Sequence, residues 1–189
     1  MLRLPVLILC LLGVLAACGP IYENGPPSPS ADEIAALRVA FAELGPEVDE
    51  AEAARAAQIA YFYPLELARR YMIEDAPVVH NMKVNRGLKP RGLCYEWADD
   101  MEARLAAEGF QTLALHRAIA TPSQPFQLEH STVIVSRMGD GWRDGLVLDP
   151  WRYGGRLFWA RVSDDRRYNW RHRQDVFAER RAQRMSFAQ

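Results

Sequence analysis

Lysine, histidine and cysteine are scarce in this chain. Its 189 residues include two lysines, four histidines and three cysteines, and the formal net charge is −1. A charge so close to zero gives no reason to expect a nucleic-acid partner. The cysteines are not spaced as zinc ligands and no HExxH pair occurs, so the sequence predicts no metal site and implies no organic cofactor. No internal repeat and no second domain is evident.

The first 17 residues are typical of a signal peptide. Arg3 gives a positive start, and the apolar stretch 4–17, interrupted only by Pro5, is too short to span a bilayer comfortably. The run Leu15-Ala16-Ala17-Cys18-Gly19 resembles the lipobox of bacterial lipoproteins. That resemblance implies a lipid on Cys18, anchorage to a membrane and, because Gly19 is not aspartate, the periplasmic face of the outer membrane. An ordinary secretory signal peptide is the alternative.

Cys94 would then be the only free thiol of the mature protein. Cys10 leaves with the signal peptide and Cys18 carries lipid, so no intrachain disulfide is possible. The cell envelope oxidises thiols, which makes a lone cysteine a liability unless it is buried or used. Cys94 is therefore either a small buried residue or a functional one.

The remaining pattern predicts one α+β domain over 31–189 behind a flexible Pro- and Gly-rich tether, 18–30. Ser30 and Glu33 form a capping box that predicts a helix from Ala31. Helices are predicted over 31–44, 46–63, 65–71, 77–85, 93–108 and 164–185, and strands over 111–116, 131–137, 145–148 and 156–162. Residues 152–184 contain ten arginines against four carboxylates. They predict either a solvated basic helical face or contact with an anionic envelope surface.

Cys94 lies where a loop turns into a helix. Cys94, Ala98, Met101 and Leu105 share one stripe, which places the thiol on the inward face of the first turn. Unpaired N–H groups and the helix dipole at this position stabilise negative charge and can also bind an oxyanion.

His130 opens one predicted strand and Asp149 closes the next. A hairpin folded about residues 138–141 pairs positions whose numbers sum to 279 or 280, so His130 would lie opposite Asp149 or Pro150. An imidazole and a carboxylate on one face could then share a hydrogen bond, unless a bulge reverses one strand. His80, His116 and His172 are competing candidates for a general base.

Three runs, Gly92–Ala98, His130–Val135 and Leu148–Trp151, resemble the transglutaminase-like superfamily within the papain-like fold, and its bacterial cysteine-peptidase branch in particular. The resemblance covers about residues 88–160 and implies a core helix packed on an antiparallel sheet. It also implies that Cys94 is a nucleophile, His130 a general base and then acid, and Asp149 the group that orients it. Ser131 departs from the alanine expected after the histidine.

Further residues are candidates for oxyanion or substrate contacts. They are Leu93, Tyr95, Asn81, Asn85 and Trp151. The sequence thus predicts a lipid-anchored envelope enzyme that attacks an amide in a protein or a peptidoglycan peptide. Transfer of the acyl group to water makes it a peptidase or amidase, and transfer to an amine makes it a transamidase. A catalytically silent binding or scaffolding lipoprotein, and a redox role for Cys94 with a partner thiol, remain open.

Overall fold

The computed structural model describes residues 22, 24–121 and 128–187 and has an α+β architecture. The predicted class is confirmed: N-terminal helices precede a cysteine-bearing helix that packs on an antiparallel sheet. The predicted signal peptide and the lipidated Cys18 lie outside the described residues. Within the described ranges, no helix is long and apolar enough to cross a membrane.

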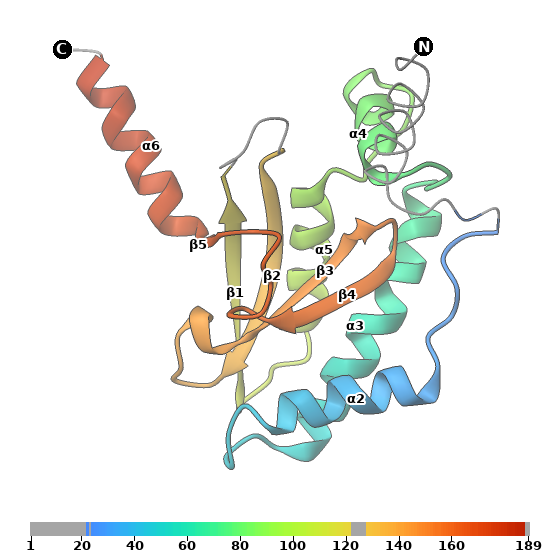
Figure 1. Ribbon diagram of the computed structural model, residues 1–189, viewed down its shortest axis with the longest axis vertical. Helices are drawn as coiled ribbons and strands as arrows, with labels where there is room; N and C mark the ends of the chain where they lie inside the picture. Colours follow the sequence, from blue (N-terminus) through green and yellow to red (C-terminus); the bar gives the residue numbers. More distant parts are fainter. Residues whose placement is uncertain (1–21, 23, 122–127, 188–189) are drawn as a thin grey trace, which may run out of the picture.

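Four helices come first in the described chain and one helix ends it. The helices are α2 (Ala31–Ala42), α3 (Glu50–Arg70), α4 (Pro77–Asn85), α5 (Cys94–Ala106) and α6 (Arg173–Phe187). The strands are β1 (Leu113–Ala120), β2 (His130–Arg137), β3 (Leu146–Tyr153), β4 (Arg156–Arg161) and β5 (Trp170–His172), with a short 3₁₀ turn, η1 (Trp142–Asp144), between β2 and β3. Helices α2 to α5 lie to one side of the sheet, and α6 projects away from it (Figure 1).

The sheet has the order β4-β3-β2-β1-β5, and every neighbouring pair is antiparallel. One face packs against α5, with Met101 and Leu105 fully buried in a core that Val133 and Val135 share. The alternate residue Ile134 belongs to a second cluster with Tyr168 and Trp170. Because side chains alternate along a strand, the two clusters occupy opposite faces of the sheet.

The helix boundaries around Pro46 and Pro64 differ from the prediction. Helix α3 begins at Glu50, because the side chain of Asp49 accepts a hydrogen bond from the N–H of Glu52 and caps the helix there. The predicted break at Pro64 was wrong, since α3 continues to Arg70. Pro64 has no backbone N–H, so the helix lacks one hydrogen bond there. The Pro64 side chain is buried, and the packing of this long helix compensates for the missing bond.

The sequence predicted a helix over 164–185, but only part of this tail is helical. Residues Trp170–His172 form β5, which pairs with β1 at the sheet edge, and α6 begins only at Arg173. Trp170 is 5% exposed. Burying its ring on the sheet outweighs the weak helical pattern of the segment. Strand β3 likewise runs on past the predicted end at Leu148 to Tyr153, with an irregularity after Asp149.

Candidate active site

The loop that leads into α5 is held by four hydrogen bonds. The Glu96 carboxylate accepts from the N–H groups of Gly92 at 2.7 Å and Leu93 at 3.0 Å. Trp97 Nε1 donates to the carbonyl of Gly92 at 3.0 Å, and buried His80 donates from Nε2 to the carbonyl of Arg91 at 2.8 Å. These contacts fix the position at which the helix, and therefore Cys94, begins.

Cys94 is the first residue of α5 and lies partly open to a pocket of about 390 Å³. Its thiol donates to the backbone carbonyl of Glu129 at 3.7 Å. The N–H groups of the first helical turn have no acceptor within the helix itself. The N–H groups of Gly92 and Leu93, just before the helix, are bound by Glu96, whereas Cys94 and Tyr95, the first two helical residues, line the pocket.

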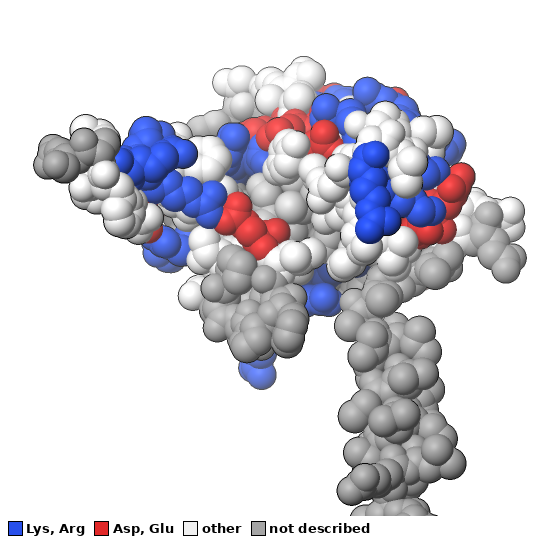
Figure 2. All heavy atoms as spheres, turned by 90° about the horizontal axis from the view of Figure 1, so that it is seen from above, with Lys and Arg blue, Asp and Glu red and all other residues white. Residues whose placement is uncertain are grey.

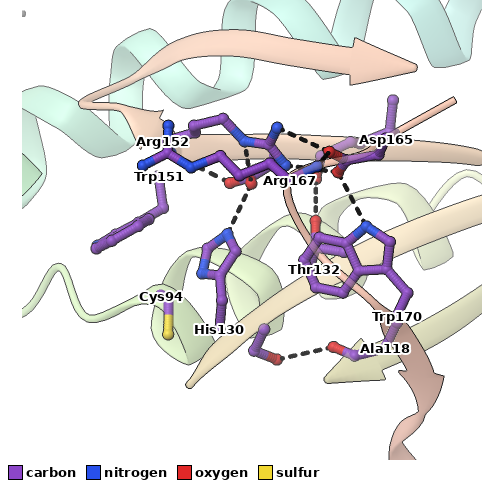
Figure 3. Close-up of polar contacts among 12 residues, drawn as sticks. Cys94, Ala118, His130, Thr132, Trp151, Arg152, Asp165, Arg167 and Trp170 are labelled. Carbon is purple, nitrogen blue, oxygen red and sulfur yellow. Dashed lines mark hydrogen bonds and ion pairs between the residues drawn. The ribbon is translucent and has the colours of Figure 1, made fainter. Parts of the chain in front are cut away.

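His130 lies beside Cys94, and its two ring nitrogens have different surroundings (Figure 3). Nε2 lies 2.6 Å from Asp149 Oδ2, and both residues are 1% exposed. Nδ1 is buried and has no hydrogen-bond partner among the residues that the structure describes. The rings of Trp151, Tyr168 and Trp170 surround the imidazole, with centroids 4.7, 4.6 and 5.5 Å away. The ring is therefore fixed, with one nitrogen bound and the other unused.

The strand register behind this contact differs from the prediction. The paired positions of β2 and β3 sum to 281 rather than 279 or 280, since Val133 pairs with Leu148 and Val135 with Leu146. Continuing that register places Asp149 opposite Thr132, so His130 is its diagonal neighbour on the same face. A shift of two in the sum of paired residue numbers, from 279 to 281, keeps both side chains on the same face of the sheet. A diagonal neighbour is also within reach of an imidazole side chain. The short η1 turn in the hairpin accounts for the shift.

A buried ion network holds Asp149. Arg152 donates from Nε to Asp149 Oδ2 at 3.0 Å, and its Nη2 lies 2.7 Å from Asp165 Oδ2. The backbone N–H of Arg152 also donates to Asp149 Oδ1 at 3.2 Å. Asp165 in turn accepts from Trp170 Nε1 at 2.9 Å. Figure 3 shows this network running from His130 to Trp170. Each buried charge thus has a counter-charge.

Electrostatics favours charged forms of both His130 and Asp149. Burial alone would lower the pKa of His130, but the carboxylate of Asp149 and the proximity of Cys94 raise that pKa to about 9. Burial alone would raise the pKa of Asp149, but His130 and Arg152 lower it. At neutral pH the pair is therefore an imidazolium against a carboxylate.

The pocket beside Cys94 brings together most of the other predicted contact residues. Asn81, Asn85, Leu93 and Tyr95 all line it, together with His130. Trp151 does not line the pocket, but its Nε1 donates to Asn81 Oδ1 at 3.1 Å. That bond uses the oxygen of the Asn81 amide and leaves its NH₂ group as the donor.

The competing histidines lie elsewhere. His80 is buried behind the Arg91 carbonyl. His116 contacts the hydroxyl of Ser136 at 2.8 Å and the ring of His172 at a centroid distance of 6.4 Å. None of the three lines the pocket at Cys94.

The sequence interpretation missed several residues around the site. Arg152, Asp165 and Glu129 carried no motif, although an arginine three residues after Asp149 is a weak sign of an ion pair. Arg173, Phe177 and Arg180 of α6 also line the pocket. Their spacing of four and three residues places them on one helical face. Counting the arginines of the tail did not reveal this pattern.

Comparison with known proteins adds no relative. No protein-family model matches the chain, and neither the curated proteins nor the solved structures contain a match. No group of three or more His, Cys, Asp and Glu side chains within the described ranges could hold a metal ion. The chemistry of the site therefore has to be argued from its own geometry.

Proposed function

We propose that this protein is a cysteine-dependent acyl-transfer enzyme that cleaves amide bonds, with Cys94 as nucleophile, His130 as proton carrier and Asp149 as the orienting carboxylate. One observation carries the proposal. His130 is held at Nε2 by Asp149 while its buried Nδ1, beside Cys94, has no partner among the described residues. A buried ring N–H without an acceptor is costly unless a group that comes and goes, such as the Cys94 thiolate, accepts from it.

Acylation begins when the Cys94 side chain turns from the Glu129 carbonyl towards Nδ1 and ionises, its proton passing to solvent, so that a thiolate faces the His130 imidazolium. The sulfur then forms a bond to the substrate carbonyl carbon, and the carbonyl π electrons move to oxygen. We assign the donors to that oxyanion to the N–H groups of Cys94 and Tyr95 and to the Asn81 amide, all from residues that line the pocket. Collapse of the tetrahedral intermediate breaks the C–N bond, and the amine leaves with the proton from His130.

Deacylation reverses the proton path. His130, now neutral, removes a proton from water or an amine, which attacks the thioester at the same carbonyl, and the Cys94 sulfur leaves. Water gives a peptidase or amidase, and an amine gives a transamidase. The pocket is large enough for one substrate side chain and is open to solvent.

The proposal includes a location. A lipid on Cys18 would hold the enzyme at the periplasmic face of the outer membrane, where its substrates would be envelope proteins or peptidoglycan peptides. This part rests on the sequence Leu15–Gly19 alone. The transglutaminase-like affiliation is likewise an inference, supported by the order cysteine, histidine, aspartate on a helix and two adjacent strands.

Labelling with iodoacetamide at pH 7 tests the enzyme proposal. We expect Cys94 of the full-length protein in detergent to react at least about tenfold faster than an unactivated thiol, and His130→Ala to lose that excess. His116→Ala is the matched control, because His116 lies outside the pocket, and it should label like the wild type. Slow labelling of folded wild-type protein, unchanged in His130→Ala, would contradict the proposal and favour a silent binding lipoprotein.

A further inference from the structure

Helix α6 forms one wall of the pocket at Cys94. Arg173, Phe177 and Arg180 reach it from one helical face, and Arg184 is the next residue on that face. Figure 2 shows basic side chains gathered along this projecting helix. Val176 is the buried residue by which α6 rests on the domain. The helix therefore presents cations, and one aromatic ring, to whatever enters the pocket.

The charges on this wall are not equivalent. Arg180 pairs with the Glu129 carboxylate through both of its terminal guanidinium nitrogens. The backbone carbonyl of the same residue, Glu129, accepts the hydrogen bond from the Cys94 thiol. That pair neutralises the acidic residue of the pocket lining. Arg173 lies 4.9 Å from the Phe177 ring and has no carboxylate partner among the described residues. Stacking on a ring orients a guanidinium and leaves its donors available.

Arg173 thus adds an unpaired cation to a pocket that already contains the His130 imidazolium. An arginine fork matches a carboxylate in shape and charge, and a half-buried position strengthens the hydrogen bonds. The apolar faces of Phe177, Ile119 and Leu93 surround the space beside it.

We infer that Arg173 is a specificity-determining residue that binds a carboxylate of the substrate, so that the proposed enzyme acts on an acidic peptide, at an amide close to a carboxylate. This inference rests on the proposed function. Phe177 holds the guanidinium, and Arg180 prevents Glu129 from repelling the substrate.

Two reagents that differ in one charge test it. N-chloroacetyl-glycine and N-chloroacetyl-glycinamide both alkylate a thiolate with loss of chloride, and only the first carries a carboxylate. Their rates at Cys94 are measured on the full-length protein in detergent, and the ratio of anionic to neutral rate is compared among variants. His130 affects every variant alike, so a change in the ratio reports on the substituted arginine.

We expect Arg173→Gln to lower the ratio of anionic to neutral rate about tenfold, the effect of one charge-assisted hydrogen bond. Arg173→Lys keeps the charge and should lose only part of the ratio. Exposed Arg181, outside the pocket lining, is the matched control, and Arg181→Gln should keep the wild-type ratio. An unchanged ratio in Arg173→Gln, or an equal fall in Arg181→Gln, would overturn the inference while the enzyme stands. Unreactive Cys94 towards both reagents would refute the enzyme itself.

Discussion

At the scale of single residues, His130 can be both buried and charged because its neighbours alternate in sign. His130, Asp149, Arg152 and Asp165 form the sequence plus, minus, plus, minus, and all four are nearly inaccessible to solvent. An unpaired charge in that position would cost several kcal/mol. The guanidinium of Arg152 also stacks on Phe158 at 3.7 Å, which fixes the cation that Asp149 requires.

The raised pKa of His130 predicts how stability depends on pH. Between pH 6.5 and about 9 the folded protein keeps a proton on His130 that the unfolded chain has lost, so stability falls as pH rises. The full contribution is present below pH 6.5, and a shift from 6.5 to about 9 corresponds to on the order of 3 kcal/mol. Urea unfolding at pH 6 and pH 9.5 should show this decline in the wild type and its absence in His130→Gln.

His116 provides a control of opposite sign. Burial lowers its pKa, so its proton is lost more easily in the folded state and its effect on stability improves as pH rises through the ordinary histidine range. His116→Gln should therefore retain the wild-type decline above pH 6.5. A decline that persists in His130→Gln would assign the pH dependence to other groups.

At the scale of elements, the entry into α5 determines where the thiol lies. Gly92 has φ +130°, a conformation that favours glycine, and a Cβ at this position would clash with His80 Nε2. His80 belongs to α4 and is buried, so it has little space to move. The contact couples α4 to the start of α5.

Gly92→Ala should therefore lower both stability and Cys94 reactivity. Backbone strain and the displaced His80 together predict a loss of about 2–4 kcal/mol in urea unfolding, and slower iodoacetamide labelling at Cys94 as the helix start shifts. Gly87→Ala is the matched control, because Gly87 also has a positive φ, +72°, but open space around it. It should cost about 1 kcal/mol and leave labelling intact. Equal effects of the two substitutions would show that strain alone acts and that His80 plays no part.

At the scale of the whole molecule, the pocket collects residues from five separate parts of the chain. Helices α4, α5 and α6 contribute to it, together with the ends of β1 and β2. Figure 1 shows α6 leaving the sheet from the short edge strand β5, so this strand fixes where α6 starts. The arginine-rich tail is therefore part of the pocket rather than an appendage.

The predicted lipid anchor belongs to this scale too. Cys18→Ser should abolish lipidation, so the protein would no longer remain with the membrane fraction of the bacterium and would appear in the soluble envelope fraction. Fractionation with immunoblotting, and the mass of the N-terminal peptide, check this outcome. Cys10→Ser lies within the predicted signal peptide and should change neither. Membrane retention of an unlipidated Cys18→Ser protein would contradict the anchor.

Local sequence patterns predicted helices and strands well where the deciding residues lie close together in the chain. The capping box at Ser30, the stripe of Ala98, Met101 and Leu105, and the short helix from Pro77 all depend on neighbours within a few residues. Predictions failed at Pro64 and at Trp170, where burial against distant elements overrides local propensity.

The sequence by itself determined the order of the reactive groups: a thiol at a helix start, then an imidazole and a carboxylate on consecutive strands. Hydrophobic periodicity and the residues that begin or end an element are local properties of the chain. Only the tertiary structure decided that His130 and Asp149 meet as diagonal neighbours, that Arg152 and Asp165 balance them, and that Arg173 lines the pocket at Cys94. Those facts depend on strand register and on contacts between residues far apart in the chain, which burial and charge balance select only when the whole domain has folded.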